Sequence, residues 1–118
     1  MKKIVIFIFL LTLSIISYSH SASEIKATFD FNSKMLYVTV EHSVKDVKSH
    51  YIKKIEIQIN GKTIITQNYT KQQNENNQEA AYLITDALIG DKITINASCN
   101  ILGTKKFTLL LNQPENNE

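Results

Sequence analysis

Two histidines on either side of a short polar loop are the first residues of this chain that point to chemistry. His42 ends the alternating apolar run that begins at Leu36, and His50 lies just before a second alternating run, Ile55–Ile59. Side chains two residues apart in a strand share a face, so we expect His42 to face inward with the apolar residues before it. Two imidazoles beside one loop on a β scaffold are half of a possible metal site.

The chain begins with the pattern of a secretory signal peptide. Lys2 and Lys3 precede an apolar run that starts at Ile4, and small polar residues follow between Ser19 and Ser23. The apolar part is short for a segment that spans a bilayer. We therefore expect a leader over 1–22, a single domain over 23–112 and a polar tail over 113–118. The expected location is periplasmic or secreted, with no membrane attachment after cleavage.

Cys99 is the only cysteine of the chain, and it ends an apolar run in which Ile93, Ile95 and Ala97 occupy the same face. Exported domains normally use cysteines in disulfide pairs, and this one has no partner within the chain. It is therefore a small buried core residue, a reactive thiol or a metal ligand. The residues alone leave these three interpretations open, and they equally allow both histidines to be ordinary polar residues at strand ends.

Short alternating runs separated by turn residues predict the elements that must position these side chains. The expected strands cover residues 25–31, 35–42, 51–59, 63–69, 80–85, 93–99 and 107–111. Asn60-Gly61 is typical of a type I′ hairpin turn, and the polar run 71–78 predicts an exposed connection. Seven such strands without a helix predict an all-β fold, an immunoglobulin-like antiparallel β-sandwich.

The charge balance excludes one class of partner. Two of the 13 basic residues lie in the leader, so the rest of the chain has as many lysines as acidic residues, 11 of each. A neutral domain without arginine lacks the basic surface that binds nucleic acid. No serine nucleophile, phosphate-binding loop or paired-carboxylate motif is recognisable, so no catalytic residue is assigned.

Several residues around the candidate ligands resemble the motifs of a known family. The matching residues are His42, His50-Tyr51-Ile52, Ile55, Ala97, Cys99-Asn100 and Gly103. They are similar to the HP…HYI and CNxHG motifs of the superoxide reductase family (desulfoferrodoxin and neelaredoxin), which has an immunoglobulin-like β-sandwich. In that family four histidines and one axial cysteine hold an iron that reduces superoxide to hydrogen peroxide. The resemblance implies an iron site at His42, His50 and Cys99, with an exported electron donor as partner.

The chain departs from the family's pattern at defined positions. Leu102 occupies the place of the CNxHG histidine, Ser43 replaces the proline after the first histidine, and the N-terminal EKH motif is absent. His20 would be a further ligand only if cleavage occurred just before it. Three ligands therefore remain, and two imidazoles with a thiolate suit copper or zinc as well as iron. Copper, zinc or no metal are the alternatives to iron.

A second interpretation belongs to another class of protein. Ile52, the turn Asn60-Gly61-Lys62 and the pair Gly90-Asp91 resemble the sulfur-oxidation carrier protein that partners a thiol-bearing subunit. That resemblance implies a non-enzymatic binding module, which docks a carrier or other exported protein through the sandwich and needs no metal. A metal-binding protein is the first hypothesis and the module is the second.

Overall fold

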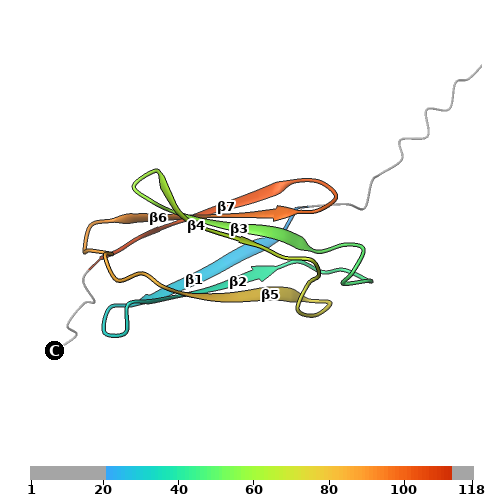
Figure 1. The fold of residues 1–118 in the computed structure, drawn as a ribbon, viewed down its shortest axis with the longest axis horizontal. Helices are drawn as coiled ribbons and strands as arrows, with labels where there is room; N and C mark the ends of the chain where they lie inside the picture. Colours follow the sequence, from blue (N-terminus) through green and yellow to red (C-terminus); the bar gives the residue numbers. More distant parts are fainter. Residues whose placement is uncertain (1–20, 113–118) are drawn as a thin grey trace, which may run out of the picture.

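Seven β-strands make up the computed structural model, which describes residues 21–112 (Figure 1). The strands are β1 (Glu24–Asp30), β2 (Met35–Glu41), β3 (Ile52–Ile59), β4 (Lys62–Asn68), β5 (Asn77–Leu83), β6 (Lys92–Cys99) and β7 (Thr104–Leu110). Between residues 21 and 112, no helix has the length and the apolar character needed to cross a bilayer.

The strands form two antiparallel sheets that face one another (Figure 1). One sheet has the order β1-β2-β5, and the other has the order β4-β3-β6-β7. The chain crosses from the first sheet to the second between β2 and β3, returns between β4 and β5, and crosses again between β5 and β6. The predicted all-β antiparallel sandwich is confirmed; its assignment as immunoglobulin-like stays a prediction.

The alternation of apolar residues explains where the core lies. β2 is the central strand of the first sheet, and β3 and β6 are the central strands of the second. Each has a neighbouring strand on both sides and the opposite sheet over its inner face, so its inward side chains are the most deeply buried. The residues of these three strands that are at most 2 % exposed are Leu36, Val38, Val40, Ile52, Ile55, Ile57, Ile93, Ile95 and Ala97. The inward rows predicted from the sequence are therefore the rows that the core uses.

The turn between β3 and β4 has the predicted conformation. Asn60 and Gly61 have φ angles of 49° and 85°. Positive φ at both central residues is the requirement of a type I′ turn, whose twist matches that of the flanking strands. The hairpin fixes the register of β3 against β4 up to an irregularity between Ile57 and Gln58.

The polar run 71–78 differs from its prediction as an exposed connection. Gln72 is 1 % exposed and Gln78 is 6 % exposed, and β5 begins at Asn77 rather than at residue 80. Both glutamines are buried because their amide groups replace water as hydrogen-bond partners of nearby backbone atoms. Gln78 Oε1, for example, accepts a bond of 2.9 Å from the backbone N–H of Gln73.

The predicted domain, 23–112, lies within the described residues, whereas the predicted tail and most of the predicted leader do not. The leader up to residue 20, which includes His20, and the tail 113–118 lie outside them. Ala22, placed in the leader by the sequence, is 3 % exposed and belongs to the core cluster. The chain just before β1 is therefore part of the packed structure.

Candidate metal centre

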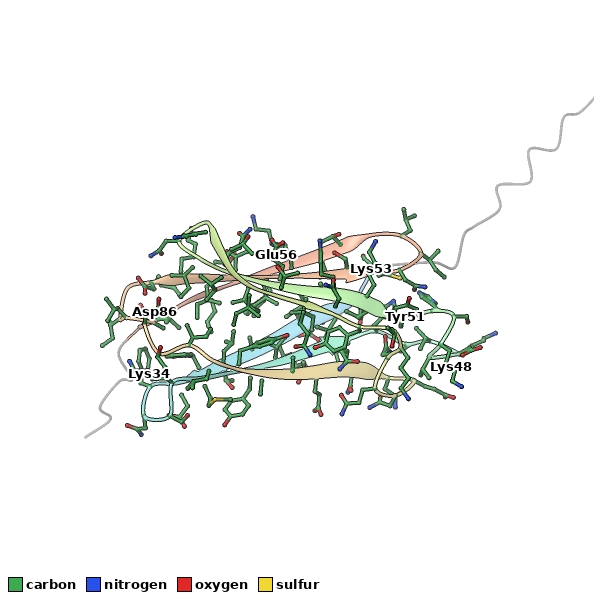
Figure 2. All side chains as sticks on the ribbon, viewed as in Figure 1. Lys34, Lys48, Tyr51, Lys53, Glu56 and Asp86 are labelled. Atoms are coloured by element: carbon green, nitrogen blue, oxygen red, sulfur yellow. The ribbon has the colours of Figure 1, made fainter. Side chains whose placement is uncertain are left out.

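Three strands meet at the end of the sandwich where the predicted ligands lie. β2 stops one residue before His42, β3 starts two residues after His50, and β6 ends on Cys99. Because β3 and β6 are antiparallel, the start of β3 lies beside the end of β6. In Figure 1 these ends and the β2–β3 loop are on the right, and in Figure 2 Tyr51 lies there, far from Lys34 at the opposite end.

The register of β3 and β6 brings the cysteine to the second histidine. Cys99 is the partner of Ile52, and the register shifts between Ile52 and Lys54. Ile52 follows His50 by two positions, so Cys99 lies opposite the segment that carries this histidine. In the sequence, 49 positions separate Cys99 from His50. Only the pairing of strands places them together.

The three predicted ligands converge. One ring nitrogen of His42, one of His50 and the sulfur of Cys99 all lie within 4.8 Å of one another. The two imidazole rings have centroids 4.7 Å apart and planes at 88°. Metal–nitrogen and metal–sulfur bonds of about 2.0 to 2.3 Å allow donors around one ion to be up to roughly 4.5 Å apart. Displacements of less than about 1 Å would therefore bring all three donors into bonding distance of one ion.

The burial of the ligands differs. His42 is fully buried, Cys99 is 3 % exposed, and His50 is partly exposed. An ion held by these side chains would have the core of the sandwich on one side, with His50 nearest to solvent. A polar histidine at such a buried position needs a hydrogen-bond partner, because an unpaired polar group in an apolar interior costs free energy.

Gln72 supplies that partner to His42. Its Oε1 lies 2.8 Å from His42 Nδ1, and its Nε2 donates to the backbone oxygen of His42 at 2.7 Å. The amide therefore holds both the ring and the main chain of this residue. No pattern in the sequence indicates this role, since Gln72 lies in a uniformly polar run that shows no apolar periodicity.

Asn100 holds the segment around His50. Its Oδ1 accepts a hydrogen bond of 2.9 Å from the backbone N–H of Tyr51, and its Nδ2 donates to the backbone oxygen of Ser49 at 3.0 Å. The backbone N–H of Asn100 also donates to the oxygen of Tyr51 at 3.0 Å. Asn100, which directly follows Cys99, thus fixes both neighbours of His50.

The sulfur of Cys99 lies in a turn that directs an N–H toward it. The backbone N–H of Ile101 donates to Sγ at 3.5 Å, and the thiol lies 3.9 Å from Asn100 Oδ1. The turn is closed by a bond of 3.0 Å from the backbone N–H of Cys99 to the oxygen of Gly103. Hydrogen bonds to a cysteine sulfur stabilise its thiolate and tune a bound metal.

Leu102, which occupies the place of a histidine ligand in the resembling motif, is on the surface. It is 63 % exposed, and its neighbour Ile101 is 52 % exposed. Leucine has no donor atom, so the candidate centre has three protein ligands among the described residues. Of the sequence-predicted site, the structure brings together His42, His50 and Cys99.

The fold and these side chains define an antiparallel β-sandwich with a candidate centre of two histidines and one cysteine at one end. Comparison with known proteins adds no assignment to a family. No protein-family model matches the chain, and no curated protein matches it significantly.

Proposed function

We propose that this protein binds one transition-metal ion through His42, His50 and Cys99. The observation that carries the proposal is the convergence of three donor atoms, from three separate segments, within 4.8 Å of one another. Exposed acidic side chains commonly cluster without holding an ion. Here two of the three ligands are buried, and each is held by hydrogen bonds that involve a side-chain amide or a backbone N–H.

The donor set favours copper and zinc over ferrous iron. Thiolate and imidazole are the ligands of His₂Cys copper centres and of zinc sites that keep one position open. Ferrous iron lies low in the affinity order of divalent ions and gains most from additional ligands. With leucine at position 102, the iron site implied by the superoxide reductase resemblance lacks one of its histidines.

A titration with cobalt(II) and zinc tests the proposal on the purified protein. Cobalt(II) gives a thiolate charge-transfer band and intense visible bands when a cysteine and two histidines hold it at four-coordinate geometry. We expect one equivalent to bind, and zinc to displace it. Cys99→Ser should abolish the charge-transfer band, and His42→Ala and His50→Ala should each weaken binding strongly.

Tyr51→Phe is the matched control, because it changes a neighbour of His50 without removing a metal-binding donor. It should bind cobalt as the wild type does. A wild-type protein that stays metal-free in the presence of excess cobalt, zinc and copper would overturn the proposal. That outcome would favour the non-enzymatic binding module, whose interaction with an exported partner does not require the three ligands.

Superoxide reduction is the second candidate function, and the pairing of two histidines with one cysteine on a β-sandwich favours it. Iron bound here would supply one electron to superoxide, giving hydrogen peroxide after uptake of two protons and leaving a ferric ion for an exported donor to reduce. The role of the chain would be to keep both rings neutral and the sulfur deprotonated, so that three donors stabilise the ion.

Stopped-flow measurement of superoxide decay with the ferrous-loaded protein tests this activity. Hydrogen peroxide formed in equal amount to the superoxide consumed supports reduction, whereas half that amount together with oxygen indicates dismutation. No acceleration over free ferrous iron would exclude the reductase and leave the metal site itself unaffected.

A further inference from the structure

Gln72 makes a set of hydrogen bonds that determines how its amide group is oriented. Nε2 donates to the backbone oxygens of His42 at 2.7 Å and Asn74 at 2.9 Å. Oε1 accepts from the backbone N–H of Ile52 at 3.2 Å and lies 2.8 Å from His42 Nδ1. If nitrogen and oxygen were exchanged, the amide oxygen would face two carbonyl oxygens and its NH₂ would face an N–H donor. The backbone therefore permits only one orientation.

This orientation determines the tautomer of His42. Ile52 N–H is a backbone donor and cannot change its role, so the atom that it contacts is an acceptor. The same oxygen lies 2.8 Å from His42 Nδ1, and two acceptors at that distance would repel one another. Nδ1 must therefore carry the proton, and the lone pair of the neutral ring is on Nε2.

We propose that Gln72 is a positioning residue that holds His42 in the Nδ1–H tautomer, and thus presents Nε2 to the metal before the ion arrives. The tautomer follows from hydrogen bonding alone, whereas the use of Nε2 as a ligand rests on the proposed metal-binding function. A neutral amide suits this task because it accepts the Nδ1 proton without adding a negative charge to the core.

Gln72 also connects the elements that carry the ligands. Through Ile52 N–H it contacts the start of β3, at the residue that pairs with Cys99, and through His42 it contacts the end of β2. Its own backbone N–H donates to the oxygen of Val47 within the loop between the two histidines. One side chain from the β4–β5 connection thus joins both sheets at the candidate centre. Partners of this kind typically contribute 10- to 100-fold to metal affinity.

The nitrogen and carbon NMR shifts of the His42 ring in the metal-free protein test the tautomer directly, at a pH at which the ring is neutral. We expect the Nδ1–H form to dominate in the wild type. Gln72→Met has nearly the same length but no acceptor, and it should yield a mixture of tautomers and bind zinc about 10- to 100-fold more weakly. Gln72→Glu keeps the acceptor for Nδ1–H but places its second oxygen against the backbone oxygens of His42 and Asn74, so it should keep the tautomer and lower the stability of the fold.

The possible results separate this inference from the metal proposal. An Nε2–H ring in the metal-free wild type would overturn the inference whatever the protein binds. A ring with Nδ1–H in a protein that binds no metal would refute the metal site and leave the tautomer assignment intact. If neither Gln72 variant folds, the ring shifts of His42 in the wild type still decide the tautomer. His50→Ala is the control, because it removes a ligand and should leave the His42 tautomer unchanged.

Discussion

Removing the side chain of Asn100 should loosen the segment that presents His50 and weaken metal binding. Asn100→Ala deletes the bond from Tyr51 N–H to Oδ1 and the bond from Nδ2 to the oxygen of Ser49. The backbone bond between Asn100 N–H and the oxygen of Tyr51 remains, so we expect the turn to stay formed. The substitution thus acts on the position of His50 and not on its donor atoms.

The expected loss of stability in Asn100→Ala depends on how far the two deleted hydrogen bonds are buried. A hydrogen bond contributes about 1 kcal/mol to stability, and more when its loss leaves a buried group unsatisfied. The bond to Tyr51 N–H is partly buried, whereas the bond to Ser49 is exposed and water can replace it. The free energy of unfolding should therefore fall by about 1 to 2 kcal/mol, mostly because the backbone N–H of Tyr51 loses its acceptor. Zinc affinity should fall about 10-fold or more, as for other groups that orient ligands.

Urea denaturation of the metal-free protein and competitive zinc titration measure the two effects. Asn100→Asp is the comparison variant, because it keeps an acceptor for Tyr51 N–H and loses only the exposed donor. It should retain more of the stability than Asn100→Ala. The reasoning is refuted if Asn100→Ala binds zinc as tightly as the wild type, or if the aspartate variant loses as much stability as the alanine variant.

The remaining predictions concern the turn beside the site and the core. Leu102→His should add a fourth donor where the resembling motif has one, and should raise ferrous iron affinity at least several-fold in a ferrous titration; an unchanged affinity would contradict the resemblance. Gly103→Ala should destabilise the fold by more than Gly90→Ala in thermal melts. Both glycines have positive φ, at 96° and 91°, but only at Gly103 would the new Cβ lie 2.7 Å from the Cβ of Ser21. Burial raises the pKa of Tyr82 above its ordinary value of 10.0. The protonated phenol is thus favoured in the folded state, so the contribution of Tyr82 to stability should be fully present below about pH 10 and be lost as the pH rises above it; Tyr82→Phe should reduce that alkaline loss.

Most of the fold was predictable because it depends on local patterns. The alternating row from Leu36 to His42 and the row that ends on Cys99 are the inward faces of β2 and β6, as predicted. The Asn60-Gly61 turn also has the conformation that its residue types favour. A period of two residues and a preference for positive φ are properties of a few consecutive residues, so they can be read without knowledge of the tertiary structure.

The run 71–78 shows the limit of such patterns. Its glutamines and asparagines predicted an exposed connection, yet Gln72 is buried against His42 and β5 begins at Asn77. Composition alone does not show whether a polar side chain will find partners in the interior. Gln72 is buried because four hydrogen-bonding atoms, on residues distant in sequence as well as nearby, surround its amide group.

The sequence by itself determined which residues have donor atoms suitable for a metal and which face of each strand they occupy. It did not determine that the donors meet. His42 directly follows β2 of one sheet, whereas Cys99 and Ile52, two residues after His50, belong to the other sheet. Their approach depends on the antiparallel register of β3 with β6 and on the crossing of the chain between sheets. Those pairings bring together segments about 50 residues apart, and only the packing of the whole sandwich decides them.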